Sequence, residues 1–218
     1  MDYRHLHDPF SNDEDKTINV AAIISNKSFS VAVNDGTASL KDARQSEEWP
    51  EWEEAIKAKL TQLQKMGNWR LVKKPPYAIP ITNKWVFAKK RNKQGRLIKY
   101  KARLVAKGYV QCPGYNYIKI HSPIVHLETI HLILAIATIK GLVIQQMDVK
   151  GAYLNGILNE QVYMHQLKGY EDGTDHICEL LKSLYSLKQS GRAWNIEFDR
   201  AMQRCSFKHL HLDPCMYI

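Results

Sequence analysis

Residues 146–156 read QMDVKGAYLNG and follow the apolar run GLVI at 141–144. This order predicts a strand over 142–149 that ends at one carboxylate, Asp148, with two small residues and Tyr153 after it. A carboxylate at a strand end suits Mg²⁺, which prefers hard oxygen ligands. It also suits the cap of a turn, and the stretch by itself favours the cap. If Asp148 binds a metal ion, further carboxylates must lie beside it.

Charge is unevenly distributed along the 218 residues. Residues 1–54 carry 12 acidic and 5 basic side chains, whereas residues 55–127 carry 17 basic and no acidic ones. A block of cations without any carboxylate attracts phosphates, and nucleic acid is the commonest partner of that kind. A lysine-rich face exposed to solvent is the alternative.

Targeting signals and cysteines restrict the class of protein. No apolar run is long enough to span a bilayer, the N-terminus has no apolar signal core, and the four cysteines form no CxxC pair. We therefore expect an intracellular protein, cytoplasmic or nuclear, with free thiols and no membrane partner.

The apolar pattern predicts a mixed α+β chain behind a linker. Residues 1–45 are acidic and polar and predict a disordered linker, with order beginning near Trp49 and one domain over 46–218. Helices are predicted at 50–66, 127–140 and 190–205, and strands at 68–72, 83–91, 95–110, 142–149 and 160–166. Residues 176–186 fit either a helix or a strand, and residues 215–218 resemble the start of a strand. The turn NKQG at 92–95 predicts a hairpin.

The predicted hairpin holds ten cations within residues 84–107. By the two-residue period of a strand, Lys99, Lys101 and Arg103 share one face, and Tyr100 and its apolar neighbours share the other. A row of cations on a β-ribbon suits phosphate contacts. An edge strand protected by lysines against aggregation is the alternative.

Five stretches together resemble one family. They are KWVFAKKRNKQGRLIKYKARLVAKGYVQCPGYNY at 84–117, SPIVHLETIHLILAIA at 122–137, QMDVKGAYLNGILNEQVYMHQ at 146–166, SLYSLKQSGRAWN at 183–195 and DPCMYI at 213–218. They occur in the order found in the reverse transcriptases of copia-type LTR retrotransposons. The resemblance implies a right-hand polymerase fold, with fingers at 69–111 and the first half of the palm at 142–166. It also implies an enzyme that copies RNA or DNA templates from deoxynucleoside triphosphates with two Mg²⁺ ions.

The resemblance also implies roles for single residues. Asp148 falls on the first metal-binding aspartate and the Val149 carbonyl on a metal contact. Tyr153 falls on the residue that packs under the incoming sugar and excludes a 2′-hydroxyl. The implied triphosphate contacts are Lys101 and Arg103, one or both, and Gln189 lies in the segment that holds nucleotide and template. The cations expected along the template and primer are Lys84, Lys89, Lys90, Lys99 and Lys107.

The partner carboxylates implied by the family are adjacent aspartates of a YVDD-type hairpin, which the 218 residues do not contain. We therefore expect a truncated fingers and partial palm that is inactive by itself. Asp199 and Asp213 are not expected to substitute. Two alternatives to a polymerase domain are a non-catalytic module that binds nucleic acid and a retroelement relic without biochemical activity.

Several residues depart from the family pattern. Ser186 stands where the family usually has glycine, Gly191 where it usually has proline, and Lys59 where a helix often has glutamate. A separate group, Cys205, His209, His211, Asp213 and Cys215, matches no common zinc spacing.

Overall fold

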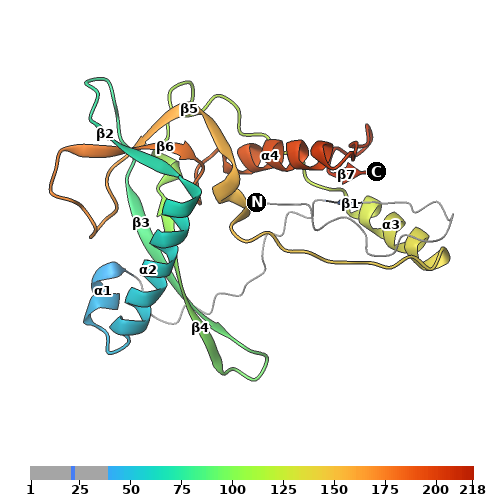
Figure 1. The fold of residues 1–218 in the computed structure, drawn as a ribbon, viewed down its shortest axis with the longest axis horizontal. Helices are drawn as coiled ribbons and strands as arrows, with labels where there is room; N and C mark the ends of the chain where they lie inside the picture. Colours follow the sequence, from blue (N-terminus) through green and yellow to red (C-terminus); the bar gives the residue numbers. More distant parts are fainter. Residues whose placement is uncertain (1–20, 23–38) are drawn as a thin grey trace.

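The structure is a computed structural model in which residues 21–22 and 39–218 are described (Figure 1). Its helices are α1 (Leu40–Gln45), α2 (Trp49–Met66), α3 (Leu127–Ile139) and α4 (Ser190–Arg204). Its strands are β1 (Ala21–Ala22), β2 (Trp69–Lys73), β3 (Asn83–Arg91), β4 (Leu97–Ala106), β5 (Ile157–Met164), β6 (His176–Lys182) and β7 (Met216–Tyr217). Short 3-10 turns are η2 (Gly108–Val110) and η3 (Ala152–Asn155). The expected mixture of helices and strands is confirmed.

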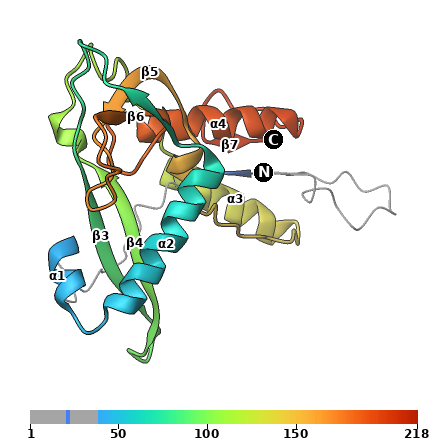
Figure 2. The same ribbon diagram turned by 60° about the vertical axis from the view of Figure 1, so that its left-hand side comes forward.

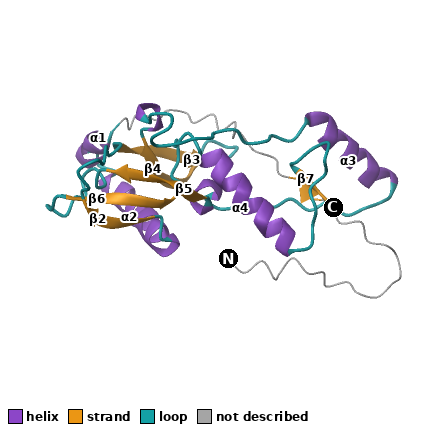
Figure 3. Cartoon of the chain, turned by 90° about the horizontal axis from the view of Figure 1, so that it is seen from above, coloured by secondary structure: helices purple, strands orange, loops and turns teal. Residues whose placement is uncertain are grey.

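The described strands form three antiparallel sheets, ordered β2-β6-β5, β3-β4 and β1-β7. Strand β6 is central in the largest sheet, which resolves the ambiguous segment 176–186 in favour of a strand. The predicted hairpin forms as β3 and β4, with the turn closed by a hydrogen bond from the Gly95 N–H to the Asn92 carbonyl at 3.0 Å. Seen from above, the larger sheets lie at one end of the molecule and α3 and β7 at the other (Figure 3).

Helix α2 packs along the hairpin (Figure 2). Its buried residues Trp52, Ile56 and Leu63 recur at helical spacing. Gly67 ends the helix in the left-handed conformation, so the helix stops at Met66, as predicted. The Trp52 ring makes edge-on contacts with Phe87 and Tyr100, with centroid distances of 5.1 and 4.6 Å. Burying a side chain such as Ile56 contributes about 1.5–3 kcal/mol, so this stripe fixes the helix against the hairpin.

Order begins earlier than the sequence predicts. Helix α1 precedes Trp49, and its Leu40 and Ala43 are buried in the core. The Ser39 hydroxyl accepts a hydrogen bond from the Asp42 N–H and caps the helix. The helix has only six residues and two buried side chains, so its hydrophobic periodicity is too weak to be recognised in a polar sequence. Residues 1–20 and 23–38 of the predicted linker lie outside the described residues.

The strand predicted at 142–149 is wrong. These residues follow α3 as an extended segment that has no partner strand in the described part of the chain, and residues 142–148 are exposed. Figure 1 shows the segment running back from α3, which stands at one end of the molecule. Apolar residues favour a strand, but a ladder also needs a neighbouring strand to accept its hydrogen bonds.

A close backbone approach positions the hairpin over the loop at 183–189. The Ala106 N–H donates to the Tyr185 carbonyl at 3.1 Å. At the next turn, a Cβ added to Gly108 would lie 1.8 Å from the Ser186 carbonyl oxygen, which no side chain tolerates.

None of the described helices is long and apolar enough to cross a membrane.

Candidate functional site

The cations of the hairpin form a cationic face, which we define as Lys84, Lys90, Lys99, Lys101 and Arg103. The register places Lys90 directly opposite Lys99, Ala88 opposite Lys101 and Val86 opposite Arg103. On β4 the alternate residues Ala102 and Leu104 are buried, so the predicted division into two faces is confirmed. Like charges paired across a sheet repel each other, and an anion bound between them would relieve that repulsion.

One predicted nucleic-acid contact, Lys89, lies outside the cationic face. The Lys89 ammonium is 2.6 Å from Glu48 Oε1, and the Tyr100 hydroxyl donates to the same oxygen at 3.1 Å. The hydrogen bond from Lys89 lowers the pKa of Glu48 below its usual value. Lys107 follows β4, and its N–H donates to the Thr82 carbonyl. The ion pair of Lys89 with Glu48, the N-cap residue of α2, therefore links this helix to the hairpin.

Asp148 lies within electrostatic reach of the cationic face. Partial desolvation lowers the pKa of Lys101, and Arg103, Lys90 and Lys99 lower it further, whereas Asp148 raises it. Asp148 is exposed and Val149 is half-buried. Of the charges that act on Lys101, that of Asp148 has the weakest effect, and 47 positions separate the two residues in the sequence.

Tyr153 lies in η3, one turn after Asp148. Gly151 begins this turn with a left-handed backbone, φ 69°. The Tyr153 ring makes an edge-on contact with Tyr185 at a centroid distance of 6.3 Å, and the Ser183 hydroxyl donates to the Tyr153 carbonyl. The turn is therefore held against the same loop that receives the end of β4.

Gln189 is buried at the start of α4, and its side chain is bonded within the protein. The Gln111 amide donates to Gln189 Oε1 at 3.1 Å, and the Gln189 amide donates to the Asn116 carbonyl at 2.9 Å. Its role toward a nucleotide stays a prediction. The contacts present join the segment after β4 to the N-terminus of α4.

Lys59 is a residue that the sequence marks only as a departure. Its ammonium donates to Gln62 Oε1 at 2.7 Å and lies 5.8 Å from the centroid of the Tyr185 ring. Burial lowers the pKa of Lys59, as do the charges of Lys101, Arg103 and Lys99. The helical spacing 52, 56, 59, 63 could have revealed it, because it places a lysine in the buried stripe of α2.

A complete metal site is not found in the described part of the chain. No three or more His, Cys, Asp or Glu side chains there lie close enough together to hold a metal ion. Asp213 instead accepts hydrogen bonds from the N–H groups of His126 and Cys215, at 3.1 and 3.0 Å. It therefore ties the loop before β7 to the start of α3.

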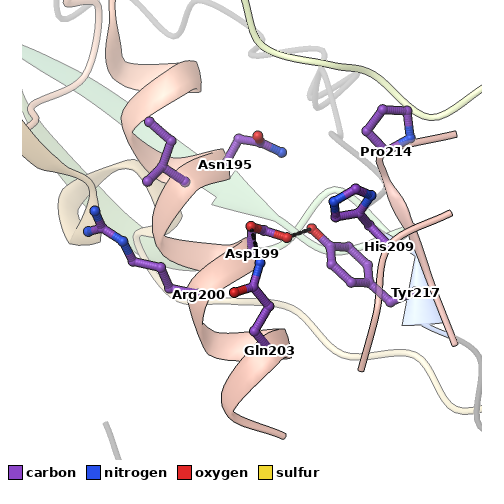
Figure 4. Close-up of a pocket in the computed structure, with 8 residues that line it drawn as sticks. Asn195, Asp199, Arg200, Gln203, His209, Pro214 and Tyr217 are labelled. Atoms are coloured by element: carbon purple, nitrogen blue, oxygen red, sulfur yellow. Dashed lines mark hydrogen bonds between the residues drawn. The ribbon is translucent and has the colours of Figure 1, made fainter. Parts of the chain in front are cut away.

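Figure 4 shows a pocket between α4 and the C-terminal residues. The Asp199 carboxylate points into it and accepts hydrogen bonds from Tyr217, at 3.2 Å, and from Gln203, at 2.7 Å. His209 and Pro214 line the opposite side. No lining residue belongs to the cationic face or to residues 146–156, so this pocket is separate from the candidate site.

Comparison with known families gives a match over most of the described chain. The family model for reverse transcriptase (RNA-dependent DNA polymerase) matches residues 66–218. The chain belongs to the reverse transcriptase family. No solved structure matches it.

Two curated relatives of this reverse transcriptase domain are plant proteins. The chain is 40% identical over 181 residues to the retrovirus-related Pol polyprotein from transposon TNT 1-94 of Nicotiana tabacum. The aligned residues make up 82% of the chain and 14% of that polyprotein. The chain is 37% identical over 184 residues to the Pol polyprotein from transposon RE1 of Arabidopsis thaliana, covering 82% and 12% respectively. The resemblance to copia-type elements is thereby confirmed, and the chain spans only a small part of these relatives' length.

Proposed function

We propose that this domain supplies the fingers and the first part of the palm of an RNA-directed DNA polymerase with a right-hand fold. In this proposal α2, β3 and β4 belong to the fingers, and residues 142–166 belong to the palm. Its substrates are a template and primer of RNA and DNA together with deoxynucleoside triphosphates. In this proposal the hairpin binds the triphosphate, and the turn at 151–155 binds the sugar of the incoming nucleotide.

One observation carries the proposal, namely the match of residues 66–218 to the reverse transcriptase family model. Phosphoryl transfer depends mainly on positioning and on neutralisation of charge. Lys101 and Arg103 would hold the triphosphate from the side of the hairpin. Tyr153, held edge-on by Tyr185, would lie beneath the sugar and exclude a 2′-hydroxyl by its bulk.

Magnesium fits the described residues only in part. Asp148 offers one exposed carboxylate and Val149 one carbonyl, and no group of three ligands is present in the described ranges. Mg²⁺ gives up water reluctantly, so this pair should hold it weakly. We therefore propose Asp148 as one ligand of a site whose other ligands come from elsewhere, and we expect the 218-residue chain by itself to extend no primer.

Primer extension tests this function. The 218 residues are placed in the Pol polyprotein of TNT 1-94 in exchange for the matching segment, and incorporation of deoxynucleotides is measured with Mg²⁺. We expect activity in this chimera and its loss in Asp148→Asn, by at least about a thousandfold if several kcal/mol of transition-state stabilisation disappear. Tyr153→Val should admit ribonucleotides. Full activity of Asp148→Asn would refute the role of Asp148.

A second candidate function is nucleic-acid binding without catalysis. The cationic face supports it, because phosphate contacts need no metal ligand. In that case Asp148→Asn would leave the affinity for an RNA–DNA hybrid unchanged, and the chimera would extend no primer.

A further inference from the structure

Four cations from two elements act electrostatically on one another, and the ammonium of one of them, Lys59, lies over the ring of Tyr185 in the loop at 183–189. Strand β4 contributes Lys99, Lys101 and Arg103, and helix α2 contributes Lys59. The charges of the three β4 residues lower the pKa of the Lys59 ammonium. No described carboxylate forms an ion pair with any of these four side chains. By contrast, neighbouring cations are paired, Lys57 with Glu53 at 3.0 Å and Lys89 with Glu48 at 2.6 Å.

Lys59 is also held in place. Its hydrogen bond to Gln62 and its position over the Tyr185 ring fix the ammonium between helix and loop. Gln62 in turn reaches the turn itself, since a Cβ at Gly151 would lie 3.2 Å from Gln62 Nε2. A half-buried, ordered cation among like charges is unfavourable in the free protein, and a bound anion would offset that cost.

We propose that Lys59 is a further phosphate-binding residue of this domain, which contacts the terminal phosphates of a nucleoside triphosphate together with Lys101 and Arg103. This inference rests on the function proposed above. A triphosphate concentrates its negative charge in one place, which suits cations that converge from two elements. Nucleic-acid phosphates are spread along a strand, which suits the row formed by Lys84, Lys90 and Lys99 instead.

Calorimetric titration of the 218-residue chain with inorganic tripolyphosphate tests the proposal. Lys59→Met removes the charge and keeps an unbranched side chain of similar length. We expect it to weaken binding about tenfold, the effect of one charge-assisted hydrogen bond. Lys57→Met, two positions away on the same helix, should change the affinity less than about twofold, because Glu53 already neutralises Lys57. Lys59→Arg should retain most of the affinity, and urea unfolding should show both Lys59 variants folded.

Further variants separate the possible outcomes. If Lys101→Gln weakens tripolyphosphate binding but Lys59→Met does not, Lys59 has no such role and the proposed nucleotide site stands. If neither change weakens it, the triphosphate site of the proposed function also fails. A short oligothymidylate provides the remaining comparison. A greater loss of affinity for the oligothymidylate than for tripolyphosphate in Lys59→Met would assign Lys59 to the nucleic-acid backbone and overturn the proposal.

Discussion

At the scale of single residues, Ser186 is held in a conformation that suits glycine. Its φ is 69°, and its carbonyl lies against Gly108. Left-handed backbone costs a residue with a Cβ about 1–2 kcal/mol, which exceeds the entropy that glycine adds to the unfolded chain. Ser186→Gly should therefore raise the free energy of unfolding in urea by about 0.5–1 kcal/mol. Ser46→Gly, at a serine with φ −83°, should lower it, and equal effects at both serines would contradict the explanation.

Sequence patterns anticipated the roles of some residues and missed others. The two-residue period placed Lys99, Lys101 and Arg103 on one face correctly, because a strand alternates its side chains whatever surrounds it. The pattern could not pair Lys89 with Glu48, since 41 positions separate them and only the packing of α2 brings them together. For the same reason the internal hydrogen bonds of Gln189 followed from no local signal.

At the scale of elements, the hairpin should dominate the salt dependence of nucleic-acid binding. With about four phosphates neutralised, the logarithm of affinity should fall with the logarithm of salt concentration with a slope near −3 to −4. Changing Lys84, Lys90 and Lys99 together to Ala should make that slope shallower by about 2. The matched set Lys65, Lys73 and Lys74 is exposed and lies off the hairpin, so its replacement by Ala should alter the slope less. Equal changes in the two triple variants would argue against a localised site.

The junction between α2 and the hairpin should depend on pH. The hydrogen bond from Lys89 lowers the pKa of Glu48 from 4.5, so the folded chain binds that proton less tightly than the unfolded chain. The resulting stability is present above pH 4.5 and is lost as pH falls through the lowered pKa. Glu48→Gln should cost about 0.5 kcal/mol at neutral pH, and the difference should vanish in acid. Unfolding in urea across this range measures it, with the exposed neighbour Glu47→Gln as the control; a difference that persisted in acid would exclude the ion pair as its cause.

Elements with a local signal were predicted well. Helix α2 has a buried stripe and a glycine stop, and the hairpin has alternation and a turn. The expected strand at 142–149 failed because its apolar residues specify no partner. Strand β6 was ambiguous because its run HICELLK lacks alternation, and its state depends on β2 and β5 on its two sides.

At the scale of the whole molecule, α3 and the segment after it leave an apolar surface uncovered. Among its members, Ile139, Val143 and Met147 are 83%, 88% and 70% exposed. Exposed apolar surface of this kind promotes association. We expect the isolated chain to bind the dye ANS and to self-associate as its concentration rises, and replacing these three residues by Lys should reduce both effects. Ile79, Ile98 and Leu212 are also exposed but lie on separate segments, so the same replacement there should matter less. A monomeric wild-type chain that binds no ANS would contradict this expectation.

The central position of β6 also has a consequence for synthesis on the ribosome. Its partner β2 is translated about a hundred residues earlier, at Trp69–Lys73. At roughly 5–20 residues per second, β2 waits about 5–20 s before the strand that pairs with it emerges. During that interval the edge of β2 is open to other nascent chains, so chaperones that shield strand edges should associate with translating ribosomes until residue 182 has left the exit tunnel.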